Sequence, residues 1–411
     1  MARKGALRLI QGVRDGRPLS DLSGVLRALP VAEQARAARL AAETLRHQGR
    51  ADVVIAGLVA RNPAPQIADV LRLGIVEMLE LGAPAHGVVG AAVDLARSLG
   101  KRGQAAAGMV NAVLRKAFAF KDWADLAPQR LPAWLREPLS EAYDPQTLLA
   151  IEAAHQRGAS LDLTLKPGTT PPPGAELLPT GSWRVRGPVQ VTALPGFDEG
   201  AWWVQDAAAA LPVRLLDPRP DEAIADLCAA PGGKTLQLAA AGARVTALDI
   251  SEQRLKRVAE NLSRCGLAAD LVAGDALQWR PDAAPDAILL DAPCSATGTI
   301  RRHPDLPYVR DGHGIAELIE LQAALLDHAL SVLRPGGRLV FATCSLIPDE
   351  GEVQIDEALS RHRGLVVERP DLPGIDPAWT TEEGGLRLRP DFWAERGGMD
   401  GFYMARLRKA G

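Results

Sequence analysis

From residue 203 onward, short apolar segments alternate with segments of helical periodicity, and this alternation restricts the fold more than any other feature. Strands that alternate with helices predict a doubly wound, mostly parallel α/β sheet, because parallel neighbours need a crossover connection. Ser251 is placed to cap one helix and Gly266 to end it. The predicted helices are 234–241, 252–264 and 315–333. The predicted strands are 223–228, 244–248, 269–272, 287–290, 338–342, 366–368 and 402–407.

The first third of the chain has a different pattern, with apolar residues near the 3.6-residue period. This pattern predicts an all-α domain over 1–125, in which helices bury their apolar faces against one another. The stretch 126–202 contains helix-breaking prolines and predicts a small α+β subdomain with strands at 161–165 and 189–191. The predicted α/β domain then covers 203–411. The predicted helices of the first domain are 32–47, 64–81, 88–98 and 104–118.

Charge is distributed unevenly along the chain. Residues 1–120 hold 17 Lys and Arg against 9 Asp and Glu, a balance of +8, whereas the whole chain has a net charge of −3. Such an asymmetry predicts that the N-terminal part meets a polyanion. The alternative is a helical domain with a solvated arginine face.

Composition indicates a soluble globular protein, with 47% hydrophobic and 24% charged residues. The sequence has no apolar run long enough for a transmembrane helix and no signal-peptide pattern. Four cysteines in 411 residues are too few for a disulfide framework. We therefore expect a cytoplasmic protein without a membrane segment, in which any special cysteine serves chemistry rather than cross-linking.

Acidic residues and cysteines follow the predicted strands at their carboxyl ends. Asp249 ends the second strand, Asp275 follows the third, and Asp291 ends the fourth. Cys294 and Cys344 lie just beyond the fourth and the fifth. Each acid alone could be a helix N-cap. Because ligands of such sheets bind outside the carboxyl ends of the strands, the five residues together predict a functional site.

The first turn of the sheet, Asp226-Leu-Cys-Ala-Ala-Pro-Gly-Gly-Lys-Thr235, is rich in glycine. Glycine lets the backbone approach a ligand and directs helix N–H groups toward it. The turn matches neither G-x-G-x-x-G nor the P-loop, which disfavours a nicotinamide-dependent oxidoreductase. Asp249 stands 23 residues after Asp226, the place of an acid that binds ribose hydroxyls.

The two cysteines at the strand ends suggest a reaction. Cytosine C5 is a poor nucleophile, but a thiolate that adds to C6 turns the ring into an enamine whose C5 can attack an electrophilic methyl group. Loss of the C5 proton and elimination of the thiolate complete the cycle. The thiolate, the group that binds the base edge and the base for the proton could come from Cys344, Asp291 and Cys294. We expect Cys265 and Cys228 to be buried small hydrophobes.

Three motifs, 226–235, 291–305 and 342–345, resemble those of the Sun/NOL1/NOP2-type RNA 5-methylcytosine methyltransferases. The resemblance covers about 203–409 and implies a Rossmann-like fold that binds S-adenosyl-L-methionine. The cofactor-binding residues that it implies are Cys228, Ala229, Ala230, Pro231, Gly232, Gly233, Lys234, Asp249, Arg254, Asp275 and Asp291.

The same resemblance implies catalytic roles. The nucleophile of the family is the cysteine of Thr-Cys-Ser, here Cys344, and the Pro-Cys cysteine, here Cys294, assists product release. Asp291 is placed where the methyl donor meets the cytosine, and Lys234 joins the catalytic group. DNA cytosine methyltransferases use the Pro-Cys cysteine as nucleophile, so the pattern with two cysteines points to RNA.

The N-terminal third resembles the NusB-type helical RNA-binding domain in the segments 43–46, 71–74, 84–86 and 110–115. This fusion is typical of the RsmB subgroup, which methylates a cytosine of 16S ribosomal RNA. A loop or single-stranded cytosine is the expected target, because a duplex base must first be unstacked. The candidate RNA-binding residues are Arg46, Arg50, Arg72, Arg115, Arg301 and Arg302.

Other functions remain open from the sequence. The same chemistry could act on tRNA or 23S rRNA, since the target depends on shape and electrostatics. A non-catalytic RNA-binding or antitermination-like factor is a further alternative, which the intact Cys344, Asp291 and Lys234 disfavour. We expect a monomer that uses no metal.

Overall fold

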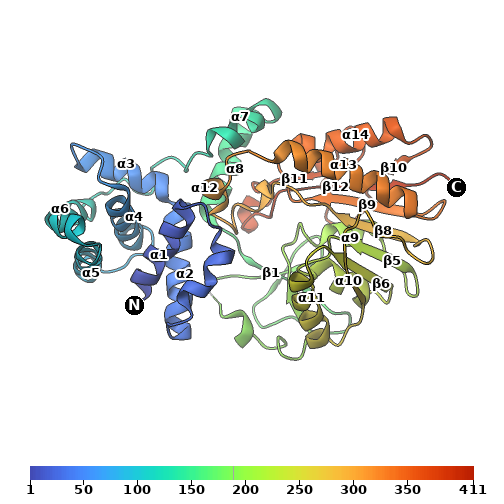
Figure 1. Cartoon of the computed structure of the whole chain (residues 1–411), viewed down its shortest axis with the longest axis horizontal. Coiled ribbons are helices and arrows are strands. Elements are labelled where there is room, and N and C mark those ends of the chain that lie inside the picture. Colours follow the sequence, from blue (N-terminus) through green and yellow to red (C-terminus); the bar gives the residue numbers. More distant parts are fainter. Residues whose placement is uncertain (188) are drawn as a thin grey trace. The chain divides into compact units, whose positions relative to one another are not determined.

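The computed structural model describes residues 1–187 and 189–411, and they form two compact units (Figure 1). This division differs from the three predicted domains, because the helices of 126–158 belong to the same unit as the N-terminal helices and the small sheet that begins at 161 belongs to the same unit as the α/β sheet. The units are the helical unit, 1–158 with 300–312, and the sheet unit, 159–299 with 313–411.

The helical unit contains the four helices predicted from periodicity and four further helices of ten or more residues that were not predicted, α1, α3, α7 and α8. The helices are α1 (Ala2–Arg14), η1 (Leu19–Leu26), α2 (Val31–Arg46), α3 (Gln48–Leu58), α4 (Pro65–Leu79), α5 (Ala85–Ser98), α6 (Lys101–Ala117), α7 (Ala133–Ala142), α8 (Pro145–Arg157) and α12 (Leu306–Val309).

Helix α4 lies at the centre of the helical unit. Its residues from Ile67 to Met78 are buried with the exception of Arg72, as expected for a helix that packs against other helices on several sides. Arg72 pairs with Asp52 and with the buried Asp69. The core therefore closes around α4, and its polar groups are satisfied within the unit.

The segment 300–312 belongs to the helical unit although it follows the Pro-Cys motif of the sheet unit in sequence. The Tyr308 hydroxyl donates to the carbonyl of Leu45 at 2.9 Å, and the N–H of Leu19 donates to the Asp305 carboxylate at 2.8 Å. These bonds attach the segment to the N-terminal helices over a sequence separation of more than 250 residues.

A small antiparallel sheet opens the sheet unit. It confirms the strand predicted at 161–165, but the strand predicted at 189–191 is wrong, because residues 191–193 form a 3-10 turn. β-branched residues favour a strand only where a neighbour can pair with them. In the order β2-β3-β1-β4, the strands are β2 (Glu176–Leu177), β3 (Trp183–Val185), β1 (Leu161–Leu165) and β4 (Trp202–Val204).

The large sheet has eight strands in the order β10-β12-β9-β8-β5-β6-β7, with β11 paired to β12. Strands β5 to β9 are parallel, and the last three pair antiparallel. All seven predicted strands are present, and the three-residue β11 was missed. The strands are β5 (Ala223–Leu227), β6 (Arg244–Asp249), β7 (Asp270–Ala273), β8 (Ala287–Asp291), β9 (Arg338–Thr343), β10 (Val366–Glu368), β11 (Leu386–Leu388) and β12 (Phe402–Arg408).

Helices cover both faces of the large sheet, which confirms the doubly wound prediction. Alternate residues of β8 point to opposite faces: Leu289 packs in the core under α9, and Leu290 in the core under α13 and α14. Ser251 caps α11 and Gly266 ends it with φ 60°, as predicted. The helices are α9 (Leu211–Leu216), α10 (Gly233–Ala240), α11 (Glu252–Cys265), α13 (Ile315–Val332) and α14 (Glu352–Arg361).

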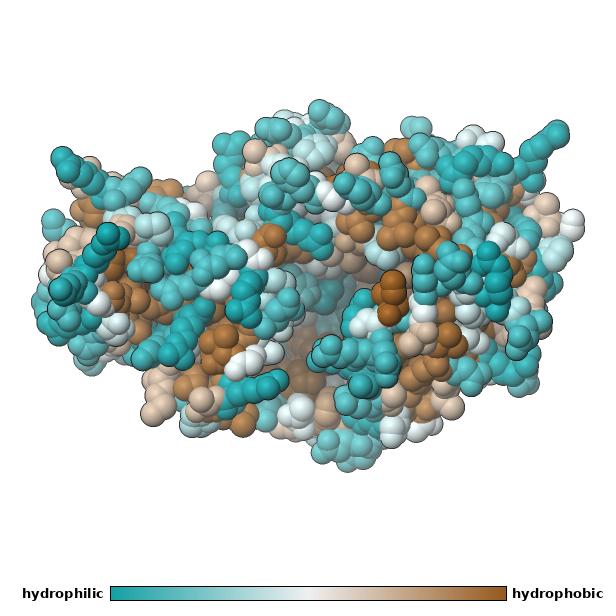
Figure 2. Space-filling view, in the orientation of Figure 1, coloured by the Kyte–Doolittle hydropathy of each residue, from teal (hydrophilic) through white to brown (hydrophobic). Residues whose placement is uncertain are grey.

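The described helices include none that is long and apolar enough to cross a membrane. Figure 2 shows hydrophilic side chains over much of the visible face of each unit, with apolar ones between them.

Candidate active site

The carboxyl ends of the parallel strands meet at one edge of the large sheet. β5 pairs with β6 on one side and β8 on the other, so the strand order changes direction at β5. The register sets Asp249 opposite Ala273 and Asp291 opposite Ala342. Ligands of open α/β sheets bind outside such a switch point. The acids predicted at the strand ends therefore share one edge.

The glycine-rich turn after β5 packs tightly against the next crossover. Cys228 has φ 63°, and Gly232, the N-cap of α10, has φ 101°. A Cβ atom at Gly232 would lie 3.0 Å from Val258 of α11, so this position requires glycine. A cis peptide bond joins Ala230 to Pro231. The turn leads into the first N–H groups of α10, which have no partner within the helix.

Asp249 and Arg254 fasten this turn to the end of β6. The nearly fully buried carboxylate of Asp249 accepts hydrogen bonds from the N–H groups of Ala230 at 3.1 Å and Ser251 at 2.9 Å. Arg254 lies 3.6 Å from the same carboxylate and donates to the carbonyl of Ala230 at 2.6 Å. Asp275, two residues beyond β7, is exposed at the same edge.

A buried carboxyl group that sequence analysis did not single out lies in β5. Asp226 is fully buried, accepts a hydrogen bond from the Thr235 hydroxyl at 2.6 Å and has a second oxygen, Oδ1, without a partner. Burial raises the pKa of Asp226 to about 7. The available signal was a single acid inside an apolar strand. Glu350, a buried acid that follows the Thr-Cys-Ser motif, was missed in the same way.

Lys234 and Asp291 form an ion pair across the edge. The Nζ atom of Lys234 lies 2.7 Å from an Asp291 carboxylate oxygen and 5.2 Å from the centre of the Phe402 ring. Both side chains are partly accessible, Asp291 at 28% and Lys234 at 11%. A cation and an acceptor are thus held together where a ligand could meet them.

The two cysteines predicted to be reactive face each other. The Sγ atoms of Cys294 and Cys344 are 3.5 Å apart, and neither is in a disulfide. The hydrogen bond to Cys344, together with burial, raises the pKa of Cys294 well above that of an ordinary thiol. Cys265, the last residue of α11, is buried in the core under that helix, as expected. Burial raises the pKa of Cys228 to about 12, so it stays a thiol.

Main-chain bonds join the two turns that carry these cysteines. The N–H of Ala292 donates to the carbonyl of Ala342, and the N–H of Gly298 donates to that of Cys344, both at 2.9 Å. A Cβ atom on Gly298 would lie 2.0 Å from the carbonyl oxygen of Gly401, so only glycine allows this approach. The backbone therefore provides two of the links between these turns.

Two of the arginines predicted to bind RNA are buried in the helical unit, and these two predictions are corrected. Arg50 is 4% exposed, donates to the carbonyl of Trp123 and lies over its ring. Arg301 is 1% exposed. A buried guanidinium group is not available to a phosphate, and Arg50 binds the carbonyl of Trp123 instead.

The other four arginines differ in accessibility. Arg46 is 9% exposed and donates to main-chain carbonyls within the helical unit, and Arg72 is held between two aspartates. Arg115 and Arg302 are exposed. Arg115 and Arg302 are therefore the members of the predicted set that a phosphate can reach directly.

No three His, Cys, Asp or Glu side chains among residues 1–187 and 189–411 are grouped as metal ligands.

Two family descriptions match the chain. "16S rRNA methyltransferase RsmB/F" matches residues 213–408, and "NusB family" matches residues 1–118. The Ribosomal RNA small subunit methyltransferase B of Erwinia tasmaniensis is 38% identical over 366 residues, which cover 82% of this chain and 81% of that protein. The protein of the same name from Vibrio cholerae is 39% identical over 369 residues, which cover 82% and 80%.

Solved structures show the same architecture. The crystal structure of PH0851 superposes with a TM-score of 0.75 at 25% identity, over 99% of this chain and 98% of that one. A methyltransferase homologue from Pyrococcus horikoshii superposes with a TM-score of 0.55 at 29% identity, over 68% and 99%.

Proposed function

Because the chain belongs to the RsmB/F family of 16S rRNA methyltransferases, we propose that it methylates C5 of one cytosine in 16S rRNA through a covalent bond between Cys344 and C6. The observation that carries this proposal is the pair of sulfur atoms 3.5 Å apart at the edge where Lys234 meets Asp291. One thiol for attack and a second for release suit a reaction that makes and breaks a covalent intermediate.

The turn after β5 fits S-adenosyl-L-methionine, which supplies an electrophilic methyl group when bound. Gly232 permits a close approach of the backbone, and the unpartnered Oδ1 of Asp226 leaves an acceptor beneath the turn. The residues proposed to hold it are Cys228, Ala229, Ala230, Pro231, Gly232, Gly233 and Lys234 in the turn, with Asp249 and Arg254 toward the ribose, Asp275 toward the adenine and Asp291 toward the methyl group.

Lys234 and Asp291 are proposed to bind the polar edge of the cytosine. A carboxylate accepts from the exocyclic amine, and an ammonium group donates to a ring acceptor. Their 2.7 Å pairing orients both groups before the base arrives. The base must leave its stack to reach them, which costs least in a loop.

Cys344 is the proposed nucleophile because its neighbour retains the proton. The raised pKa of Cys294 leaves that sulfur protonated, so its S–H can donate to the sulfur of Cys344, 3.5 Å away. Sγ of Cys344 then bonds to C6, the electron pair moves to C5, and C5 takes the methyl group from the sulfonium donor, which leaves as a neutral thioether.

Release requires a base for the C5 proton, and we assign this role to Cys294. Once Cys344 is bonded to C6, it no longer accepts the hydrogen bond or carries the charge that raise the pKa of Cys294. The Cys294 thiol can then ionise by releasing its proton to solvent, and the thiolate accepts the C5 proton. The electron pair restores the C5–C6 double bond, and the bond from C6 to Cys344 breaks to regenerate the thiolate.

Arg115 and Arg302 are proposed to contact RNA phosphates, and the excess of positive charge in residues 1–120 supports an RNA-binding role for the helical unit. The exposed Arg302 follows the Pro-Cys motif directly in sequence. We propose a cytoplasmic monomer, in keeping with four free cysteines.

The test is nucleoside mass spectrometry with site mapping after incubation of the protein, S-adenosylmethionine and unmodified 16S rRNA. We expect one 5-methylcytidine at one position, and none with Cys344→Ala. Product on tRNA or 23S rRNA instead would retain the chemistry and overturn the substrate. Absence of product on all three RNAs would overturn the proposed activity.

A further inference from the structure

One buried carboxylate connects the residues that follow the two cysteines. Glu350, at the end of η4 (Pro348–Glu350), is fully buried. Its Oε1 atom accepts a hydrogen bond from the N–H of Ser295 at 2.8 Å, and its Oε2 atom accepts from the hydroxyls of Ser345, at 2.6 Å, and Ser295. Ser295 follows Cys294, and Ser345 follows Cys344.

Neighbouring side chains hold this carboxylate in place. Gln322 of α13 donates to Glu350 at 3.0 Å and also to the carbonyl of Pro293 at 2.8 Å. The hydroxyl of Thr343 donates to the carbonyl of Glu350 at 2.8 Å. A buried carboxylate with several donors is rigid, because breaking any bond leaves an unpaired polar group in the interior.

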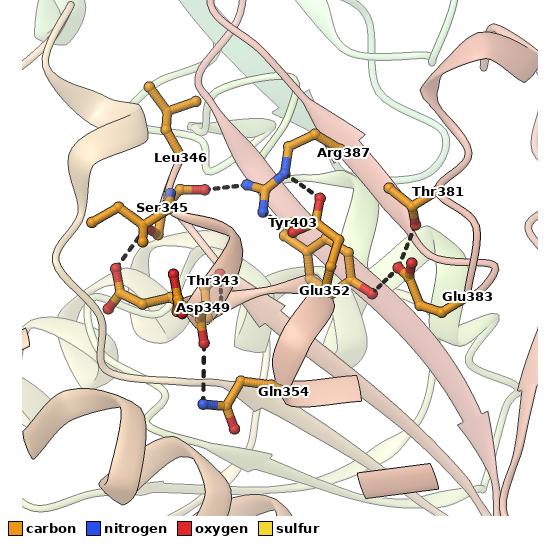
Figure 3. A network of polar contacts seen from close by, with 12 residues as sticks. Thr343, Ser345, Leu346, Asp349, Glu352, Gln354, Thr381, Glu383, Arg387 and Tyr403 are labelled. Atoms are coloured by element: carbon orange, nitrogen blue, oxygen red, sulfur yellow. Dashed lines mark hydrogen bonds and ion pairs between the residues drawn. The ribbon is translucent and has the colours of Figure 1, made fainter. Parts of the chain in front are cut away.

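The second cysteine turn is also held from its other side. Figure 3 shows Arg387 between Ser345 and Glu352, against the ring of Tyr403. Its guanidinium donates to the carbonyl of Ser345 and to the carboxylate of Glu352. Ser345 is therefore fixed at its carbonyl by Arg387 and at its hydroxyl by Glu350. Of these two residues, only Glu350 also binds Ser295, so Glu350 links the two turns and Arg387 does not.

We propose that Glu350 is a positioning residue that holds the two cysteine turns in the register at which their sulfur atoms meet, and that product release depends on it. The inference deepens the proposed function and rests on it for the release step. Glu350 touches neither sulfur through a hydrogen bond and acts through Ser295 and Ser345. Because the mechanism passes a proton from the reaction centre to Cys294, a small displacement of that sulfur slows release.

The first test measures the sulfur geometry without any RNA. Diamide, a thiol oxidant, accepts two electrons and two protons and converts the facing thiols of Cys294 and Cys344 into a disulfide, which peptide mass spectrometry identifies. In the wild-type protein we expect rapid formation. Glu350→Gln replaces one acceptor oxygen with a donor amide, and we expect disulfide formation to slow by roughly ten-fold or more. Unchanged formation would overturn the proposal.

A matched control separates positioning from a general loss of structure. Glu222 is another buried carboxylate, 2.6 Å from Arg338 at the opposite end of the sheet, so Glu222→Gln should leave disulfide formation unchanged. If Glu350→Gln does not fold, Ser345→Ala removes one of the carboxylate's donors with less disturbance and should also slow it. Equal slowing in Glu222→Gln and Glu350→Gln would show that the slowing comes from a general loss of stability, and it would contradict a positioning role.

The second test follows release. With 16S rRNA, Glu350→Gln should lower kcat by roughly 10²-fold with little change in the KM for S-adenosylmethionine. The fraction of protein linked to RNA on a denaturing gel should rise above the wild-type level. A fall in kcat without accumulation would show that Glu350 does not act on release. If wild-type protein methylates no RNA, the proposed function fails while the disulfide assay still reports on Glu350.

Discussion

Buried polar groups serve different purposes at the strand edge and in the helical unit. At the edge, reactive groups face one another, and the sulfur atoms of Cys294 and Cys344 lie 3.5 Å apart. In the helical unit, two largely buried arginines bind the backbone: Arg50 donates to the carbonyl of Trp123, and Arg46 donates to the carbonyls of His155 and Arg301 at 3.1 and 2.8 Å. The first arrangement leaves side chains able to react. The second provides hydrogen-bond donors for the carbonyls of chain segments that are distant in sequence but adjacent in the fold.

This difference shows how well the location of a side chain in the fold can be predicted from its position in the sequence. The carboxyl ends of parallel strands share one edge whatever the sequence separation, so a residue just after a strand has few directions open to it. A long arginine on a helix can extend to solvent or fold inward, and its sequence position does not decide between them. Substitutions in each region test this contrast.

The largest expected effect is at the edge. Cys344→Ala removes the proposed nucleophile, so methylation should fall by roughly 10⁴-fold or more while S-adenosylhomocysteine still raises the melting temperature. Radiolabel transfer from S-adenosylmethionine to RNA measures the methylation rate. A thermal shift assay measures the rise in melting temperature with S-adenosylhomocysteine. Cys265→Ala is the control and should retain activity, because Cys265 is a buried cysteine at the end of α11. Substantial methylation by Cys344→Ala would remove this cysteine from the mechanism.

A second prediction concerns stability in the helical unit. Arg50→Ala leaves the carbonyl of Trp123 without its donor and should lower the free energy of unfolding by about 2 kcal/mol. Arg115→Ala, on an exposed side chain, should change it by less than about 0.5 kcal/mol. Denaturant titration of both variants provides the measurement. Equal changes in the free energy of unfolding for the two variants would show that the buried contacts of Arg50 do not stabilise the protein.

A third prediction concerns pH. Burial raises the pKa of Asp226 to about 7, so the folded protein keeps a proton that the unfolded chain releases near pH 4. The free energy of unfolding should therefore fall as pH rises from about 4 to about 7, by up to about 1.4 kcal/mol per pH unit. Asp226→Asn cannot titrate and should flatten this dependence. Parallel curves for the two proteins would contradict the raised pKa.

The smallest predicted effect concerns RNA affinity. Arg302→Ala should remove one phosphate contact and reduce the slope of log K against log salt by about 1, with a modest loss of affinity. Arg50→Ala should leave the slope unchanged, since its guanidinium is directed into the interior. Filter binding to 16S rRNA at several salt concentrations gives both slopes. A reduced slope for Arg50→Ala would show that Arg50 contacts a phosphate and would contradict its assignment as a buried structural residue.

The sheet unit was largely predictable because its signals are strong and local. Apolar strands, the cap at Ser251 and the stop at Gly266 all lie where expected. The brief β11 and the 3-10 turn at 191–193 were not predicted correctly, because such short elements depend on a pairing partner rather than on their own sequence.

The connections between the cysteine turns could not be predicted. Glu350 looks like one acid among several after the Thr-Cys-Ser motif, and only the fold shows that its carboxylate reaches Ser295, 55 residues earlier. The burial of Arg301 has the same origin, since the segment 300–312 joins helices from the other end of the chain. Both features depend on packing between segments that are distant in sequence, so no local sequence pattern predicts them.

The most direct test of the mechanism compares Cys294→Ala with Cys344→Ala after incubation with 16S rRNA and S-adenosylmethionine, with protein–RNA adducts counted on a denaturing gel. If Cys344 attacks and Cys294 serves release, Cys294→Ala should accumulate a slowly migrating adduct and Cys344→Ala should form none. An adduct with Cys344→Ala, or none with Cys294→Ala, would contradict this division of roles.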